Sequence, residues 1–400
     1  MDTLKRLKLF QKTRAEVKDP QAECDGIVLY LNTSGRKFLG MDVLSLDFSF
    51  VNPRYIFLLT MMISFLYADL EAAVLADDIG GFAYNIAVLG FGLQGFAKFD
   101  AYVYRKKFMH DLVWQCSAFL GKNKGHDRFS TFLVDNVAVI MIVSKFYYRL
   151  YGLVFFTCAT FGILQSVMSG ERLLSFGFQF SFLDTNNWVG FTLTYCYQVI
   201  NSLMVVISSC CNDILIAIVY VNAMSMYDCI MSDLRELSKI SEMEKTQDNK
   251  RLAEEQMKSI IQQHQHLMQF LDLSNDVYSS YFLMSLASMT GTIAVLLTAL
   301  VMVRWYPAIV ICFAASFQIF TLSLLGTLLL IKGEELIQQV YDINWYNLDL
   351  PVQKSLKLLL LISQNNKEIS YRFGVMNMET FVQSHKLVYS FFTMLVTTKE

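Results

Sequence analysis

Apolar residues occur in seven long stretches of this chain, separated by polar segments of unequal length. The stretches cover residues 55–75, 81–99, 149–168, 188–209, 280–303, 305–331 and 375–396. Each is long enough to cross ~30 Å of hydrocarbon as a helix. The pattern therefore predicts an all-α membrane protein with seven transmembrane helices. The first span is expected to act as the insertion signal, because the charged N-terminal stretch has no apolar core of its own.

The distribution of positive charge predicts the orientation. Of the 33 Lys and Arg residues, the segments 1–52, 98–131, 228–274 and 332–374 hold 8, 7, 6 and 5, respectively. The connections on the other side carry only Arg172 and Arg304. Cations are favoured on the cytoplasmic side of a membrane. We therefore expect the N-terminus inside and the C-terminus outside, which is the reverse of a G-protein-coupled receptor.

The long polar connections are predicted to continue membrane helices into a cytosolic anchor bundle. Residues 241–280 contain no Pro or Gly, and apolar side chains recur there at three- and four-residue spacing, as expected for one buried helix face. These are Leu252, Met257, Ile260, Ile261, His264, Leu267, Met268 and Leu271. A shorter helix is expected after Pro351, with an apolar run at 355–363 that packs on neighbours or on other subunits.

Four regions follow from these patterns. Residues 1–52 form a cytoplasmic N-terminal segment. Residues 53–331 form a six-helix transmembrane domain, with a ligand pocket in its outer half and a cytosolic extension near 228–274. Residues 332–374 form a cytosolic anchor segment, and residues 375–400 form a pore-lining last helix.

Composition excludes several function classes. The chain is 54% hydrophobic and 17% charged, with a mean hydropathy of +0.39. Its net charge of −2 and the lack of a basic stripe argue against a nucleic-acid partner. No metal-ligand spacing, phosphate-binding loop or nucleophile motif is present, so we expect no enzyme activity, cofactor or metal. The cysteines inside the spans are expected to pack as small apolar residues; they are Cys158, Cys196, Cys210, Cys211 and Cys312.

Three segments of the C-terminal third carry a family resemblance. They are HQHLMQF at 264–270, YDINWYNL at 341–348 and FVQSHKLVYSFFTML at 381–395. The first is similar to a His-Gln-x-Ile-Leu-x-Phe pattern, the second to a Trp-Tyr element, and the third to a Phe-x-x-Ile-Leu-Lys-x-Ser-Tyr-Ser-x-Phe-Thr-x-Leu ending. Together, in this order, they resemble the insect odorant receptor family. The short 228–274 segment lacks the long insertion of that family's coreceptor, so the chain resembles an odour-tuned subunit.

The resemblance implies a ligand-binding subunit of a heterotetrameric, non-selective cation channel in the plasma membrane of olfactory sensory neurons. Such a subunit works with the coreceptor, binds a small volatile odorant and requires no G protein. The alternatives are a G-protein-coupled-type heptahelical chemoreceptor, a homomeric gustatory-type channel and a transporter. The chain lacks the Asp-Arg-Tyr, Cys-Trp-x-Pro and Asn-Pro-x-x-Tyr motifs of the first, and it lacks the repeated halves of a transporter.

A pocket for a volatile ligand needs apolar and aromatic walls with a few polar groups. The outer halves of the second, third, fourth and sixth spans supply such candidates, although an aromatic residue at helical spacing is often simple core packing. The candidates are Val88, Phe91, Phe155, Phe156, Thr160, Tyr195, Val199, Phe317, Gln318 and Thr321. No charged residue occurs at that depth in the third, fourth or sixth span, which favours a neutral odorant.

The last span has a mixed polar and apolar face that fits a pore lining, or alternatively packs on the fifth and sixth spans. This face contains Thr380, Gln383, Ser384, Leu387, Phe391, Met394 and Thr398. The resemblance implies that Met394 and Thr398 lie at the outer constriction, with Thr397 beside them. The predicted pore-lining residues are Gln383, Leu387, Phe391, Met394, Thr397 and Thr398.

Ionisable residues at span edges allow two readings. Asp213 either pairs with Arg149 or Lys145, or each of these side chains extends to water independently. Four acidic residues are expected in the first outer turn, where they either raise the local cation concentration or form an ordinary solvated loop. They are Asp69, Glu71, Asp77 and Asp78.

Overall fold

The chain folds as an elongated bundle of helices in the computed structural model, which describes residues 8–42, 44–45, 52–123, 125–170, 172–244, 246–365 and 367–397. No strand occurs in those ranges. The elements are α2 (Lys8–Glu16), α3 (Pro20–Ser34), η1 (Gly35–Leu39), α4 (Pro53–Val74), α5 (Ile79–Asn85), α6 (Leu89–Phe99), η2 (Asp100–Tyr104), α7 (Lys106–Asn123), α8 (Asp127–Ser169), α9 (Trp188–Ser241), α10 (Gln247–Val303), α11 (Pro307–Tyr341), η3 (Trp345–Asn347), α12 (Leu350–Ser363) and α13 (Met378–Thr397).

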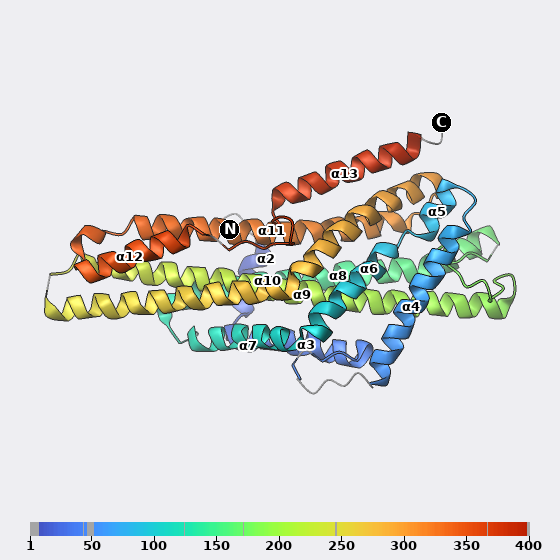
Figure 1. Ribbon diagram of the computed structural model, residues 1–400. Helices are drawn as coiled ribbons and strands as arrows, with labels where there is room; N and C mark the ends of the chain where they lie inside the picture. The colour runs from blue at the N-terminus through green and yellow to red at the C-terminus, as the bar shows by residue number, and fades with distance from the viewer. Residues whose placement is uncertain are drawn as a thin grey trace.

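Four long helices, α8 to α11, run side by side along the bundle, and the shorter helices lie along its sides (Figure 1). Six segments of the described chain are long and apolar enough to cross a membrane: α4, the α5–η2 segment, α8, α9, α10 and α11. The seventh expected span corresponds to α13, which has 20 residues and includes Glu379 and Lys386. The predicted all-α membrane fold is confirmed; the orientation of the termini and the four regional boundaries stay predictions.

All four prolines of the chain lie in the first turn of a helix, where the missing N–H has no helical partner to lose. Two of these helices are also capped by side chains. Asp19 accepts hydrogen bonds from the first backbone amides of α3, and Asn52 accepts one from the Arg54 amide of α4. The helix predicted after Pro351 is therefore found, for a local reason that the sequence already contains.

The helices extend far beyond one membrane thickness. The 57 residues of α10 correspond to about 85 Å of helix, against ~30 Å of hydrocarbon. In the extension, Met257, Ile260 and Leu267 are buried, whereas Leu252 is exposed. The short helix α12 packs beside this end, which is the predicted cytosolic end (Figure 1).

The second span is not the continuous helix that 81–99 predicted. It is divided into α5 and α6 by a turn at 86–88. Gly90, which follows the turn, explains part of this arrangement. A Cβ atom there would lie 1.8 Å from Thr292 Oγ1 and 2.7 Å from the Ser288 carbonyl oxygen, so α6 approaches α10 as closely as only glycine permits.

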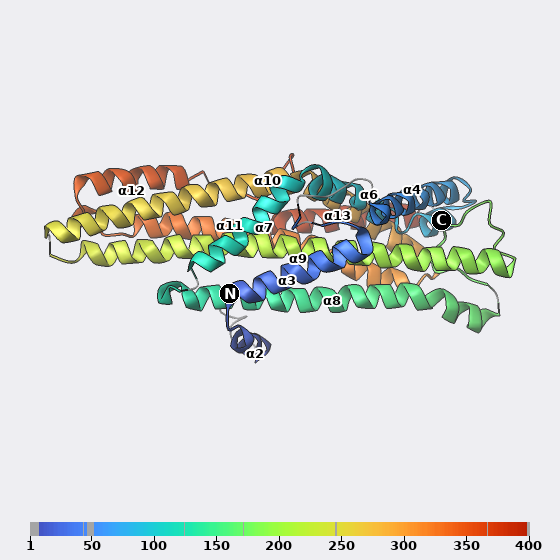
Figure 2. The same cartoon turned by 90° about the horizontal axis from the view of Figure 1, so that it is seen from below.

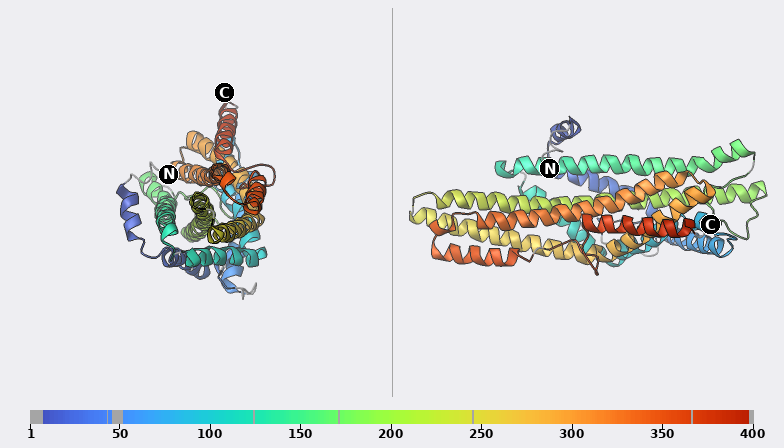
Figure 3. Two further views of the ribbon diagram at one scale, coloured as in Figure 1. Left: turned by 90° about the vertical axis from the view of Figure 1, so that its left-hand side faces the viewer. Right: turned by 90° about the horizontal axis from the view of Figure 1, so that it is seen from above.

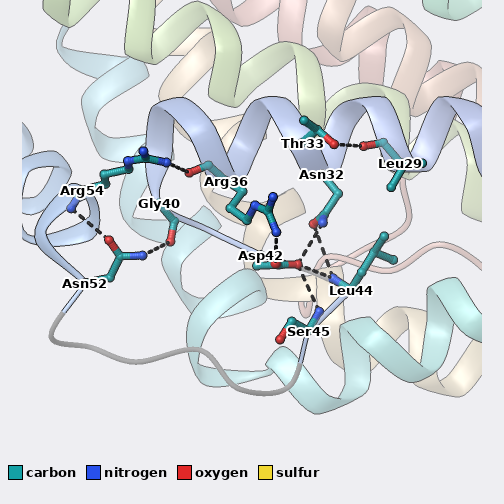
Figure 4. Close-up of polar contacts among 10 residues, drawn as sticks. All are labelled: Leu29, Asn32, Thr33, Arg36, Gly40, Asp42, Leu44, Ser45, Asn52 and Arg54. Carbon is teal, nitrogen blue, oxygen red and sulfur yellow. Dashed lines mark hydrogen bonds and ion pairs between the residues drawn. The ribbon is translucent and has the colours of Figure 1, made fainter.

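The N-terminal helices pack on the side of the bundle that lies opposite α13. Figure 2 shows α3 and α7 crossing the long helices, with α2 standing out beside α8. The connection from η1 to α4 is held by side-chain hydrogen bonds around Asp42, whose Oδ1 accepts from Asn32 Nδ2 at 2.9 Å and from the amide of Ser45 at 3.1 Å (Figure 4). Gly40 ends η1 with φ 69°, and a Cβ there would lie 2.7 Å from the Tyr55 amide nitrogen.

Candidate functional site

A cavity with a volume of about 50 Å³ lies among α6, α8, α9, α11 and the 172–187 connection, and we call it the outer pocket. Its walls are almost wholly apolar and contain no charged residue. They are formed by Phe65, Val88, Phe91, Tyr151, Val154, Phe155, Cys158, Phe176, Phe178, Asn201, Ser202, Val205, Val206, Ser209, Ile311 and Ala314. The cavity is smaller than the ~150 Å³ that holds benzene in a rigid core, so a ligand of odorant size requires wall side chains to move.

The outer side of the pocket is roofed by aromatic residues of the 172–187 connection. Phe176 and Phe178 both line the cavity, and Phe178 packs edge-on against Phe65 of α4 at 5.1 Å between ring centroids. Gln198 of α9 holds this roof in place. Its amide donates to the carbonyl oxygens of Phe176 and Phe178 at 3.1 and 2.8 Å, and its Oε1 accepts from the Phe176 amide at 3.2 Å.

Trp305, in the turn between α10 and α11, fixes the roof from another side. Its indole nitrogen donates to the Ser175 carbonyl oxygen at 3.1 Å. The Tyr84 hydroxyl of α5 donates to the Leu174 carbonyl oxygen at 3.3 Å. The roof is thus tied to three separate parts of the bundle, which closes the pocket on this side.

Two hydroxyl groups, those of Tyr151 and Ser209, form the polar floor of the pocket. The Tyr151 hydroxyl donates to Asp213 Oδ2 at 2.5 Å. Ser209 Oγ accepts a hydrogen bond from Lys98 Nζ at 2.8 Å. Both charged side chains are buried, with 2% and 4% of Asp213 and Lys98 exposed. The pocket therefore touches, through one hydroxyl each, a carboxylate and an ammonium group inside the bundle.

The carboxylate of Asp213 is the centre of a network that joins five helices. Gln318 of α11 donates to both carboxylate oxygens at 2.9 and 3.1 Å, and Tyr281 of α10 lies 3.3 Å from Oδ1. Gln94 of α6 donates in turn to Gln318 Oε1 at 3.1 Å. Polar groups this deep in an apolar bundle are stable only when they are hydrogen-bonded, and Asp213 meets that condition on both oxygens.

These contacts correct two expectations about charge. Asp213 pairs with neither Arg149 nor Lys145: it turns into the bundle, while Arg149 is exposed and Lys145 bonds Glu16 at 3.1 Å. Asp69 does not belong to the outer turn. It is fully buried in α4, and neither of its carboxylate oxygens has a hydrogen-bond partner in the described chain. The helix period explains this position, because Asp69 lies one turn after Phe65 on the buried face of α4.

Three of the ten predicted ligand residues line the outer pocket: Val88, Phe91 and Phe155. Four others line no part of it. Phe156 is 66% exposed on the outside of α8, Thr160 and Val199 are half-buried outside the pocket, and the Tyr195 hydroxyl donates to the Ala159 carbonyl oxygen.

The remaining three lie on α11 near the network. Phe317 packs against Phe146 with 4.5 Å between ring centroids, Gln318 bonds Asp213, and Thr321 is buried. Sequence reasoning missed Phe65, Tyr151, Ser209 and the roof residues. The alternating aromatics of FGFQF at 176–180 are the signal that could have pointed to the roof. A ligand-binding role for any of these residues stays a prediction.

The last helix, α13, has two different faces. Thr380, Ser384 and Val388 are buried against α10 and α11, although the first two were expected on the pore face. Gln383, Leu387, Phe391, Met394 and Thr397 are exposed in the single chain, and Thr398 lies outside the described residues. Figure 1 shows the C-terminal end of α13 diverging from the bundle, and the end-on view of Figure 3 shows α13 projecting away from it.

The cysteines of the described chain are free, and five of the eight are buried. Outside the spans, burial raises the pKa of the Cys24 thiol to about 12, so it stays protonated and unreactive at neutral pH. Burial also raises the pKa of the Cys116 thiol. Cys196 is exposed rather than packed in the interior as expected.

Comparisons with known proteins agree with this geometry. The model of the family described as 7tm Odorant receptor matches residues 78–389. The solved structure of the insect olfactory receptor OR5 from Machilis hrabei in complex with eugenol has a TM-score of 0.73 at 14% identity, covering 94% of this chain and 97% of that chain. A second structure of the same receptor gives 0.75 at 15% identity with the same coverage. No curated protein matches the chain.

Proposed function

Because this chain belongs to the 7tm Odorant receptor family, we propose that it is the odorant-binding subunit of a heteromeric, ligand-gated, non-selective cation channel. It opens when a small neutral volatile binds, and it works in the plasma membrane of olfactory sensory neurons together with a coreceptor subunit. No G protein is required. The observation that carries the proposal is the apolar pocket beneath the aromatic roof.

The composition of the pocket walls favours a neutral ligand. Every wall residue is uncharged, and the buried charges behind the floor are oriented toward hydroxyl groups and amides. Burying an ionic ligand in such a place requires a partner of opposite charge on the wall. The OR5 structure from Machilis hrabei, which this chain resembles in fold, is a complex with eugenol.

Helix α11 contacts both the pocket and α13, which is consistent with ligand binding being coupled to α13 through this helix. Ile311 and Ala314 line the pocket. Within two turns, Ser316 Oγ lies 3.3 Å from His385 Nε2 of α13, and the rings of Phe320 and Phe381 are 5.6 Å apart. A shift of α11 on ligand binding therefore moves side chains that hold α13.

Assembly with other subunits is supported by apolar surface that one chain leaves uncovered. On α12, Leu358, Leu361 and Ile362 are exposed on the face opposite the buried Leu356 and Leu359. On α13, Leu387 and Met394 are about half exposed. Exposed apolar residues of this size, clustered on one face, mark protein contacts.

Electrical recording tests the proposal directly. We expect odour-gated cation current in cells that express this chain with a coreceptor, when a panel of small volatiles is applied, and little or none with this chain alone. The current should persist when G-protein signalling is blocked. Surface expression with the coreceptor but without current to any volatile would overturn the proposal, and equal current without the coreceptor would overturn obligate hetero-assembly.

The orientation can be tested separately by tagging both termini and probing intact cells. An accessible C-terminal tag and a protected N-terminal tag are expected from the distribution of Lys and Arg. The reverse result, an accessible N-terminal tag, would overturn the channel proposal.

A further inference from the structure

The ammonium group of Lys98 is under-coordinated for a buried cation. It has three N–H donors, and Ser209 Oγ is the hydrogen-bond partner that the structure gives it. Asp213 acts on it electrostatically from farther away, without an ion pair within 4 Å among the described residues. Asp213 itself is saturated, with contacts from Tyr151, Gln318 and Tyr281. The unused hydrogen-bonding capacity therefore lies on the cation.

This donor lies beside empty space that adjoins the outer pocket. A second cavity of about 40 Å³, the inner cavity, is lined by Lys98 together with residues of α4, α6 and α9. It shares Phe65, Phe91, Asn201 and Val205 with the outer pocket. The two cavities therefore adjoin each other along these four residues, and Lys98 lines the inner cavity but not the outer pocket.

We propose that this site selects ligands that carry a neutral carbonyl oxygen, such as ketones, aldehydes and esters, and that Lys98 donates a hydrogen bond to that oxygen. The inference rests on the proposed function and names the ligand class of the same site. The apolar part of the ligand occupies the outer pocket. The oxygen reaches the ammonium group past Phe65 and Phe91, which line both cavities and move to admit it.

Charge balance explains why a neutral oxygen fits better than a carboxylate. Lys98 and Asp213 together have no net charge, so a carboxylic acid bound as an anion would leave one uncompensated negative charge in an apolar bundle. A ligand without an acceptor atom makes no hydrogen bond to the Lys98 ammonium, so it binds with one charged hydrogen bond fewer than a ketone does. Such a bond is sufficient for a tenfold to hundredfold preference.

The test uses the full chain with its coreceptor and a homologous series of methyl ketones. Each ketone is paired with the alkene in which a methylene replaces the carbonyl oxygen, and with the carboxylic acid of equal chain length. The wild-type channel should respond to the ketone at about tenfold to hundredfold lower concentration than to the alkene. Lys98→Met should remove most of this preference while the response to the alkene persists.

Lys98→Met leaves Asp213 without a nearby cation and can impair folding. The double variant Lys98→Met with Asp213→Asn removes both charges and should show the same loss of preference. Lys107→Met is the matched control, because it removes an exposed lysine of α7 far from both cavities. Lys107→Met should keep the ketone preference. A Lys98→Met channel, with or without Asp213→Asn, that also keeps it overturns the inference, as does a wild type that prefers the acid or responds equally to ketone and alkene. The proposed function fails separately, when no volatile of any class evokes current.

Discussion

Two glycines in neighbouring helices show how strongly the effect of one methyl group depends on its surroundings. Gly326 lies on α11 where the Met376 backbone crosses it, and a Cβ there would be 1.7 Å from the Met376 carbonyl oxygen. Gly291 lies on α10 with no atom within 4 Å of the position of its Cβ. The first glycine is required by a backbone contact, whereas the second only lowers the stability of its helix.

We therefore expect Gly326→Ala to destabilise the protein by about 1–3 kcal/mol, because backbone must shift to admit the methyl group. Gly291→Ala should instead stabilise it by about 0.5–1 kcal/mol. Melting temperatures of the two purified variants in detergent would check this pair. A Gly326→Ala protein as stable as the wild type would show that α11 and the segment before α13 are not in the contact described.

Gln198 offers a second prediction at this scale, because one amide holds three backbone groups of the roof. Gln198→Leu preserves the approximate volume but removes all three hydrogen bonds, which leaves buried backbone groups unpaired. We expect a roof that opens more readily, seen as faster onset and decay of odour-gated current. Gln383→Leu, on the exposed face of α13, should leave the onset and decay rates of the current unchanged and should alter cation permeation instead.

Among the helices, α13 has one face that packs against the bundle and one face that is predicted to line the pore. Its buried face contacts α10 and α11, and its exposed face is the predicted pore lining. Met394→Asp would put a charge into a narrow ring of subunits, so closed-state leak or cation permeability should change much more than the rank order of odorants. Phe155→Ala, in the pocket wall, should do the reverse. Reversal potentials and dose–response curves measure the two effects, and an unchanged permeability in Met394→Asp channels would place this face away from the pore.

The elements also show where sequence reasoning succeeds and fails. Long apolar runs, first-turn prolines and the stripe at 252–271 depend on local pattern, and helices are present at these places, although Leu252 is exposed. The break between α5 and α6 was missed because the contact beside it, the close approach of Gly90 to Thr292, joins residues that are 202 positions apart. The roof was missed for a related reason: Phe176 and Phe178 lie outside every span, and contacts with residues of other elements, such as Gln198 and Trp305, hold them over the pocket.

On the scale of the whole molecule, the surfaces that need partners lie apart from those that hold the ligand. The bundle carries α13 on one side and α3 and α7 on the other (Figure 3). The outer pocket lies among α6, α8, α9, α11 and the 172–187 connection. The exposed leucines of α12 lie near the predicted cytosolic end (Figure 1). Assembly and ligand recognition should therefore respond to different substitutions.

We expect Leu358→Glu with Leu361→Glu to reduce the recovery of complexes with the coreceptor, because two charges would enter an apolar contact. Lys354→Glu is the matched control, since it changes the charge of an exposed position on the same helix. Co-purification from cells gives the measurement. Full recovery of the complex from the double glutamate variant would show that α12 is not part of the subunit contact.

The buried pair of Lys98 and Asp213 has a consequence for how the chain is made. Lys98 lies in the last turn of α6, and a lysine in an apolar segment opposes the transfer of that segment from the translocon into lipid. Asp213, the opposite charge, is synthesised more than a hundred residues later. The segment around α6 is therefore expected to stay at the translocon or the membrane surface until α9 has been synthesised. The two helices then insert into the bilayer together. A chain that carries Asp213→Leu alone should then be retained and degraded in the endoplasmic reticulum, whereas adding Lys98→Met to it should restore export to the cell surface.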